Sequence, residues 1–278
     1  MSYRVPKFWG LEARPSGRLR AVLAALLFVA AIALYLGCSY IRHQHNEQDK
    51  LLPTPGQMVD AVKRMAFEED QRTGGYLFWQ DTASSLKRIG IGVGTAALLG
   101  LLLGLNMGLF QGLEALTLTF VTVLSIIPPL AVLPILFMTF GVDEFAKIML
   151  IFIGTFPMIC RDVYQGVKKT PVEQITKAIT LGASPLQVVY RIILPQTLPR
   201  LIDTARLSMG SAWLFLISSE AIASTDGLGY RIFLVRRYLA MDVIIPYVIW
   251  ITLLGFSVDW LLKTFVAWKF RWYGAAET

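Results

Sequence analysis

Long apolar runs constrain this chain more than any other feature of its sequence. About six of them approach or exceed the roughly 20 residues that an α-helix needs to cross the ~30 Å hydrocarbon layer of a bilayer. The chain of 278 residues is 55% hydrophobic, with a mean hydropathy of +0.57, which is too apolar for an ordinary soluble domain. The sequence therefore predicts an all-α, polytopic membrane helical bundle of about six transmembrane helices. The predicted spans are residues 21–40, 89–109, 113–140, 145–160, 202–223 and 243–266.

The basic residues flank these runs in a pattern typical of membrane proteins. Five basic residues precede the first run, six lie between residues 161 and 200, and Lys269 and Arg271 follow the last run. Because cytoplasmic loops are enriched in Lys and Arg, we expect a multi-pass protein of the bacterial inner membrane with both termini in the cytoplasm. This orientation explains the net charge of +7. The expected environment is a lipid bilayer, and no nucleic-acid partner is expected.

The first apolar run is open to two interpretations. A basic flank followed by about 20 apolar residues describes a first transmembrane helix, but it also describes a cleaved signal peptide, and Gly37-Cys38 resembles a lipoprotein cleavage site. Tyr35 stands where such a signal would have Leu. We therefore favour the uncleaved helix.

Two polar segments are expected on the outer face. Residues 42–85 contain seven acids and five bases, and within them residues 51–67 predict an amphipathic helix at the membrane interface. The second segment, residues 224–242, carries three arginines against the charge rule. Either a short helix beginning at Gly227-Leu228-Gly229 shields them, or the other loops outweigh them. These arginines are Arg231, Arg236 and Arg237.

No motif for covalent chemistry is present in the sequence. There is no Gly-rich phosphate loop with Lys and Ser/Thr, no nucleophile elbow and no paired Cys or His ligands. The two cysteines, Cys38 and Cys160, are far apart, and His43 and His45 lie together in a polar loop. We therefore expect a chain that is not an enzyme by itself and that binds no cofactor or metal.

Residues 170–199 form a polar stretch between two apolar runs, and we call this stretch the elbow. Thr170 is expected to cap a helix that starts at Pro171 and carries Glu173 at its third position. Gly182 is expected to end that helix. A second capping box follows, with Ser184 as the cap, Pro185 first and Gln187 third, and Pro195 is expected to end the second helix.

The elbow resembles the cytoplasmic coupling loop of ABC importer permeases, which have a type I importer fold. The residues that match the family pattern are Ala178, Gly182, Ala183, Ser184, Leu194, Pro195 and Pro199. Thr176 and Lys177 stand where the family has Glu and Ala, which leaves the polar contacts with the partner undetermined. The resemblance implies that the coupling residues are Glu173, Ala178, Gly182, Ala183, Ser184, Pro185, Gln187, Leu194 and Pro195.

The resemblance also implies partners for the chain. These are separate ABC ATPase subunits that bind ATP and Mg, an extracytoplasmic solute-binding protein, and a second permease copy in a homodimer. The apolar faces of the elbow are expected to enter a cleft in the ATPase, whose closure would drive alternating access. These faces are Ile175, Ala178 and Ile179 on the first helix and Val188, Val189, Ile192 and Ile193 on the second.

Other stretches are similar to the nitrate, sulfonate and taurine branch of this family. Leu52-Pro53-Thr54-Pro55 resembles the start of its external amphipathic helix, and Ser85-Leu86-Lys87-Arg88 resembles the start of its second span. Residues 211–238 also resemble permeases associated with urea or guanidine carboxylases. These similarities imply a small polar solute, either nitrate-, sulfonate- or taurine-like, or urea- or guanidine-like.

Several residues within the runs are candidates for the solute pathway or a gate. Prolines bend the third run, and irregular backbone at membrane depth is tolerated only where protein or a watery cavity covers it. Glu220 is expected to face the bundle and to bond Ser218 or Ser219. Glycines four residues apart, Gly90/Gly94 and Gly100/Gly104/Gly108, predict a helix-packing seam. The pathway candidates are Asn106, Ser125, Pro128, Pro129, Pro134, Ser218 and Glu220.

The sequence thus divides into an N-terminal region, residues 1–84, with a cytoplasmic tail, the first span and the amphipathic segment. A permease core follows at residues 85–270, and a cytoplasmic tail at residues 271–278. Two alternative functions remain. An ion-gradient-driven carrier would need ionisable groups within its spans, and a non-transporting membrane scaffold would need no ATPase.

Overall fold

All regular structure in the described part of the chain is helical, which confirms the predicted all-α class. The computed structural model describes residues 16–46, 49–70, 74–222 and 224–274. Most of the basic N-terminal tail, Ala223 at the end of the predicted fifth span, and residues 275–278 lie outside the described residues. The helices are α1 (Gly17–His45), α2 (Pro55–Phe67), α3 (Leu77–Leu109), α4 (Gln111–Ile126), α5 (Pro129–Phe140), α6 (Glu144–Lys168), α7 (Val172–Thr180), α8 (Pro185–Val188), a π-helical turn η1 (Val189–Ile193), α9 (Leu194–Ile222), α10 (Leu228–Arg236), α11 (Met241–Lys269) and α12 (Arg271–Gly274).

Three of the helices, α1, α3 and α11, are long and apolar enough to cross a membrane. The predicted third run is broken at Ile127 and Pro128 into α4 and α5, which meet at 98° and could count as a fourth, bent span. α6 and α9 have 25 and 29 residues, and at 1.5 Å per residue each is about 37 Å or more in length. The count of six spans therefore stays a prediction that depends on α6 and α9.

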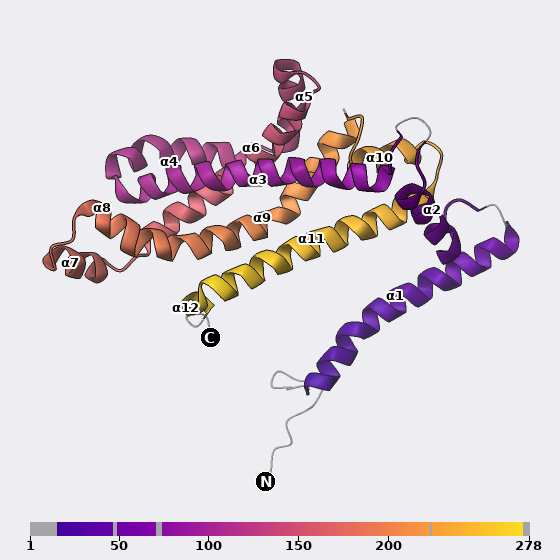
Figure 1. Cartoon of the computed structure of the whole chain (residues 1–278), viewed down its shortest axis with the longest axis horizontal. Helices are drawn as coiled ribbons and strands as arrows, with labels where there is room; N and C mark the ends of the chain where they lie inside the picture. Colours follow the sequence, from indigo (N-terminus) through magenta and orange to yellow (C-terminus); the bar gives the residue numbers. More distant parts are fainter. Residues whose placement is uncertain (1–15, 47–48, 71–73, 223, 275–278) are drawn as a thin grey trace, which may run out of the picture.

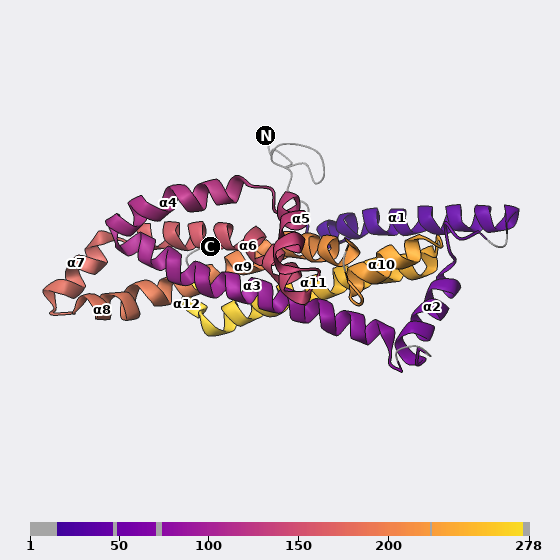
Figure 2. The ribbon, with the colours of Figure 1, turned by 90° about the horizontal axis from the view of Figure 1, so that it is seen from above.

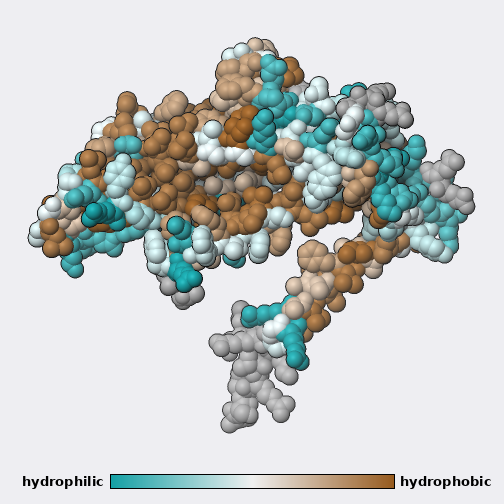
Figure 3. Space-filling view, viewed as in Figure 1, coloured by the Kyte–Doolittle hydropathy of each residue, from teal (hydrophilic) through white to brown (hydrophobic). Residues whose placement is uncertain are grey.

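The long helices run along one axis of the molecule. α7 and α8 lie at one end and α2 and α10 at the other, with α3, α6, α9 and α11 between them (Figures 1 and 2). α5 leaves the bundle sideways, and α1 diverges from it. Hydrophobic surface covers the middle of the molecule, and hydrophilic surface gathers towards both ends (Figure 3). This distribution is the one expected of a bundle whose middle faces lipid.

Hydrogen bonds fix the C-terminal part of α1 and the start of α2. Tyr35 Oη and Ser39 Oγ on α1 donate to the carbonyl oxygens of Pro53 and Leu52 at 2.8 and 2.9 Å. α2 begins with a capping box, in which Gln57 N donates to Thr54 Oγ1 at 3.4 Å and Thr54 N donates to Gln57 Oε1 at 2.8 Å. A helix within the predicted residues 51–67 is thus confirmed, and it spans Pro55–Phe67.

The glycines of α3 bring its backbone against α6. A Cβ built on Gly104 would lie 2.5 Å from the carbonyl oxygen of Cys160, and one on Gly108 would lie 2.5 Å from Val167 Cβ. Gly92 and Gly100 face α6 in the same way. The predicted packing seam is confirmed at residues 100, 104 and 108. It is wrong at Gly90 and Gly94, which meet open space, because the seam continues along the face that contains Gly92.

We predict that Gly104→Ala lowers the melting temperature of the purified protein in detergent. The added methyl group must push the Cys160 carbonyl away, and such overpacking typically costs about 1–3 kcal/mol. Gly94→Ala is the matched control, because its methyl group meets no atom within 4 Å. Equal melting temperatures for the two variants would contradict the close α3–α6 contact.

Candidate functional site

The second turn of the elbow forms the capping box that the sequence predicts. Ser184 Oγ accepts from Gln187 N at 3.3 Å, and Ser184 N donates to Gln187 Oε1 at 2.9 Å, with Pro185 in the first turn of α8. This pair satisfies two backbone donors that a helix start otherwise leaves without partners. The beginning of α8 is therefore fixed by its local sequence.

Gly182 ends α7 in the way that the sequence predicts. Its φ of +85° lies in the left-handed region that favours glycine. Gly182 N donates to Ile179 O at 2.9 Å, and Ala183 N donates to Ala178 O at 3.0 Å. These are the two hydrogen bonds of a Schellman motif. The corner between α7 and α8 is thus a closed, hydrogen-bonded turn.

Two predicted boundaries of the elbow are wrong. α7 begins at Val172 with Pro171 as its cap and no side-chain capping bond, because Thr170 is buried and its N–H donates to Val167 O at the end of α6. Pro195 does not end a helix, since α8, η1 and α9 form one continuous helix. The π turn shifts the register, with Leu194 N donating to Val189 O, so the missing N–H of Pro195 is accommodated.

The elbow exposes only part of the apolar face predicted for it, since Ile179 is exposed while the other members are buried or partly buried. Val188 and Ile193 are 5% and 2% exposed and pack with Val167 of α6, so the expectation that they enter an ATPase cleft is wrong. Ile175, Ala178 and Ile192 are partly buried in the same cluster. The exposed apolar side chains of the elbow are Val172, Ile179, Leu181, Leu186 and Tyr190.

The predicted coupling residues divide into two groups by exposure. Ala178, Ala183, Leu194 and Pro195 are half-buried against the bundle. Beneath the elbow, an apolar groove of about 410 Å³ lies between α7, α8 and the ends of α3 and α6. The exposed members of the set are Glu173, Gly182, Ser184, Pro185 and Gln187.

Polar contacts join the start of α9 to α6 and to α7. Arg200 on α9 donates from Nε and Nη2 to Asp162 on α6 at 2.8 and 2.6 Å, and Thr204 Oγ1 donates to the same carboxylate at 2.6 Å. Gln196 Nε2 donates to Gln174 Oε1 on α7 at 2.9 Å. The start of α9 is therefore hydrogen-bonded to both α6 and α7.

The pathway candidates do not gather at one place. The side chains of Asn106, Ser125 and Ser218 bond carbonyl oxygens of their own helices, and Arg161 also donates to Ser125 Oγ at 3.3 Å. Pro128 and Pro134 are exposed and Pro129 is half-buried near the 98° bend. The bend is thus confirmed, while the role of these residues in transport stays a prediction.

Glu220 is fully buried, as predicted, but its partners differ from those predicted. Ser218 and Ser219 bond carbonyl oxygens of their own helix, because residues one or two apart on a helix do not face each other. Glu220 instead accepts from Ser85 Oγ at 2.8 Å and from Arg88 Nη1 at 2.6 Å, both on α3. Glu220 therefore links α9 to α3 through hydrogen bonds.

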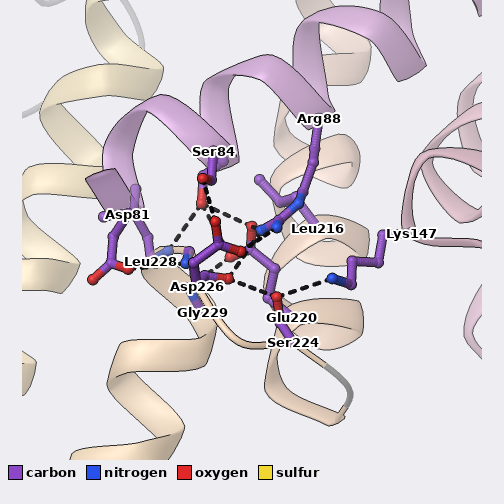
Figure 4. Close-up of polar contacts among 12 residues, drawn as sticks. Asp81, Ser84, Arg88, Lys147, Leu216, Glu220, Ser224, Asp226, Leu228 and Gly229 are labelled. Carbon is purple, nitrogen blue, oxygen red and sulfur yellow. Dashed lines mark hydrogen bonds and ion pairs between the residues drawn. The ribbon is translucent and has the colours of Figure 1, made fainter. Parts of the chain in front are cut away.

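Arg88 contacts two further acids besides Glu220, and Figure 4 shows one of them, Asp226, next to Glu220 at the guanidinium. Its Nε and Nη2 donate to Glu144 at the start of α6 at 2.6 and 2.7 Å, and Nη2 donates to Asp226 Oδ1 at 2.5 Å. Lys147 donates to Glu144 Oε1 at 2.8 Å. Burial alone would raise the pKa of Asp226, but hydrogen bonds from Ser84 and Arg88 outweigh it, so the pKa lies below its usual range.

Side chains next to Arg88 accept hydrogen bonds from the backbone at the start of α10. Gly227 N donates to Asp81 Oδ1 at 2.9 Å, Leu228 N to Ser85 Oγ at 2.9 Å, and Gly229 N to Glu220 Oε2 at 2.8 Å. These acceptors satisfy N–H groups that the first turn of a helix leaves free. The short helix predicted after Gly227-Leu228-Gly229 is confirmed.

Shielding by α10 applies to one of the three predicted arginines. Arg231 is mostly buried and donates to Asp81 Oδ2 at 2.8 Å, whereas Arg236 and Arg237 are exposed. Sequence reasoning missed the partners Asp81, Glu144 and Asp226. The sequence feature that could have indicated these partners is a charged residue near the end of an apolar run. Such a residue tends to pair with an opposite charge, because an isolated buried charge is costly.

Comparison with known proteins decides the family. Residues 96–270 match the family described as the binding-protein-dependent transport system inner membrane component. The chain belongs to this family. The match contains the elbow, α6 and all of α9 to α11.

The curated relatives of this ABC permease include proteins of the nitrate, sulfonate and taurine branch. The chain is 31% identical over 229 residues to the taurine transport system permease protein TauC of Escherichia coli (strain K12), covering 81% of this chain and 82% of TauC. It is 31% identical to the putative aliphatic sulfonates transport permease protein SsuC of the same strain, covering 76% of this chain and 77% of SsuC. It is 33% identical to the bicarbonate transport system permease protein CmpB of Synechococcus elongatus, covering 70% of this chain and 69% of CmpB.

A solved structure confirms the fold of the permease. The inward facing MetNI methionine ABC transporter aligns with a TM-score of 0.58 and 19% identity, covering 69% of this chain and 95% of the matched chain. This likeness concerns the fold alone. With the family, it identifies a type I ABC importer permease, a non-catalytic, multi-pass component of the inner membrane that works with an ATPase and a binding protein.

We predict that Ser184→Ala loosens the first turn of α8. Loss of a Ser cap typically costs about 1 kcal/mol, so hydrogen exchange at the Gln187 amide should become roughly fivefold faster if this turn opens locally. Thr180→Ala is the matched control, because Thr180 Oγ1 bonds only the Thr176 carbonyl of its own helix. Unchanged exchange at Gln187 would contradict the capping role of Ser184.

Proposed function

We propose that this permease imports a small polar solute and receives the energy for transport through its elbow. The observation that carries the proposal is the geometry of residues 170–199. The elbow contains a closed turn at one end of the bundle, it exposes several large apolar side chains, and it continues at its two ends into α6 and α9. Such an element could receive a displacement from a separate ATPase subunit.

The exposed face of the elbow is the proposed contact with the ATPase. Leu181, Leu186 and Tyr190 are 87%, 69% and 64% exposed, and large apolar side chains at protein surfaces mark interaction sites when they cluster. Closure of an ATPase dimer would displace this face. α6 and α9, which continue from the two ends of the elbow and are joined by the Asp162–Arg200 pair, would then move as rigid bodies.

The chemistry of ATP is assigned to the partner. Among the described residues, no group of three or more His, Cys, Asp and Glu side chains could hold a metal ion. We propose that ATP and Mg²⁺ bind to the ATPase subunit and that this chain binds no cofactor. ATP hydrolysis is thereby separated from the solute pathway.

The proposed assembly contains two copies of this chain, two ATPase subunits and an extracytoplasmic solute-binding protein. Homodimers are the commonest symmetric oligomers, and the family is named for its binding protein. We propose that the elbow end faces the cytoplasm with both termini and that α10 faces outward. The basic residues between 161 and 200 support this orientation.

The solute is proposed from the relatives and from the sequence resemblance together. The names of the relatives specify taurine, aliphatic sulfonates and bicarbonate, all small and polar. The resemblance of residues 211–238 adds urea and guanidine to the solutes to be tested. The alternative of an ion-gradient-driven carrier has less support. Glu220, the acid near the end of the predicted fifth span, accepts hydrogen bonds from Arg88, Ser85 and Gly229.

We predict that Gly182→Val abolishes the stimulation of ATP hydrolysis by solute-loaded binding protein. Gly182 has a φ of +85°, which a β-branched residue cannot adopt without strain. Gly182→Asn is the matched control, since Asn tolerates the left-handed conformation. The measurement is ATPase activity of the reconstituted complex with each candidate solute.

Normal stimulation in Gly182→Val would contradict the elbow as the coupling element. Uptake that persists without ATP but collapses with the proton gradient would instead support a carrier. Purification of the chain from its host without an associated ATPase would support a scaffold.

A further inference from the structure

Arg88 brings together side chains from three helices and one loop. It lies on α3 and contacts Glu144 on α6, Glu220 on α9 and Asp226 in the loop before α10. The side chains of Arg88 and Glu220 are 2% and 0% exposed, whereas those of Glu144 and Asp226 are 59% and 42% exposed. Figure 4 shows the side chains converging on the guanidinium from separate helices.

All five guanidinium N–H donors of Arg88 have acceptors. Nε donates to Glu144 Oε2, Nη1 to Glu220 Oε1 and to the Asp226 carbonyl oxygen at 3.0 Å, and Nη2 to Glu144 Oε1 and Asp226 Oδ1. A Lys side chain offers three donors on a single nitrogen and cannot reproduce this planar fork. The position therefore requires Arg rather than positive charge alone.

No side chain fits between this cluster and the start of α10. A Cβ on Gly227 would lie 2.5 Å from Glu220 Cδ and 2.6 Å from Arg88 Nη1, and one on Gly229 would lie 2.8 Å from the Ile217 carbonyl oxygen. Since Glu220 also accepts from Gly229 N, the orientation of α10 depends on the carboxylate that Arg88 holds in place.

The helices that meet at Arg88 are the ones that carry the elbow. α6 leads directly into α7, and α8 continues through η1 into α9. Between the two ends, α3 and α6 are in backbone contact along the glycine seam, and α6 and α9 are joined by Asp162 and Arg200. The elbow and α10 lie at opposite ends of the bundle (Figure 1), and Arg88 contacts the loop that precedes α10.

We propose that Arg88 is a positioning residue that makes α3, α6, α9 and α10 one rigid body, so that α10 and the elbow move together. This proposal rests on the proposed function, because it assigns to α10 the outward face that meets the binding protein. Through Arg88, the orientation of α10 is linked to the position of the elbow. Docking of the binding protein and closure of the ATPase are thereby coupled across the length of the bundle.

The test measures an intramolecular distance and a coupled activity in the reconstituted complex. Spin labels are placed at Lys169→Cys beside the elbow and Arg236→Cys on α10, both at exposed positions, in a Cys38→Ser background because Cys38 is exposed and Cys160 is buried. Labelled copies are diluted in unlabelled ones to remove distances between copies. The second readout is ATP hydrolysis stimulated by solute-loaded binding protein.

We expect one narrow distance in the otherwise unchanged chain, equal with and without trapped ATP. In Arg88→Gln the distance distribution should broaden, and the stimulation should fall roughly tenfold, within the range typical of coupling between distant sites. The ATPase should still co-purify, since the elbow is untouched. Arg64→Gln is the matched control, because its ion pair with Asp242 spans 4.0 Å and is exposed; it should change neither readout.

A second variant keeps the proposal testable if Arg88→Gln does not assemble. Asp226→Ala removes the loop carboxylate but leaves Arg88 paired with Glu144 and Glu220, and it should also broaden the distance. A narrow distance with full stimulation in whichever variant assembles would overturn the proposal, as would a lower melting temperature with both readouts unchanged. Absence of stimulation in the unchanged chain would contradict the proposed function instead, and the distance would still decide the role of Arg88.

Discussion

The close contact between α3 and α6 is the interaction on which the rest of the structure depends. Gly104 and Gly108 bring the α3 backbone against the Cys160 carbonyl and Val167, and this approach leaves no room for slippage between the two helices. In a bilayer, helices gain little from hydrophobic exclusion, so close packing and interhelical hydrogen bonds stabilise their association. α9 is added to this pair through Asp162–Arg200 at one end and Glu220–Arg88 at the other.

The placement of charge follows from the same constraint. Ionised groups are costly within an apolar bundle unless they are paired, and the pairs described here lie towards the ends of the helices. Asp162 and Arg200 lie near the elbow, whereas Arg88, Glu144, Glu220 and Asp226 lie near α10. On the face shown in Figure 3, the surface in the middle of the molecule is mainly hydrophobic. A permease of this family is a non-catalytic membrane component of its transporter.

The sequence predicted those features whose causes are local. The all-α class follows from the apolar runs, the Ser184 capping box from four neighbouring residues, and the Gly182 corner from the conformational freedom of glycine. The continuation of the helix through Pro195 could not be predicted, because it depends on a π turn whose register shift leaves no mark in composition. The choice of Gly92 over Gly90 and Gly94 depends on which face α6 occupies. The partners of Glu220 could not be predicted either, because Ser85 and Arg88 are more than 130 residues away along the chain and no local pattern relates them.

We propose that the elbow faces the cytoplasm and is moved by an ATPase. The most direct test of this proposal is a single cysteine at Leu181, which is 87% exposed, in a Cys38→Ser background, with thiol labelling and cross-linking in native membranes. We predict that a membrane-impermeant thiol reagent does not label this cysteine in intact cells, labels it in inverted vesicles, and that a cross-linker joins it to the ATPase subunit. Labelling of intact cells from outside, or no cross-link to the ATPase from any exposed elbow position, would contradict the account.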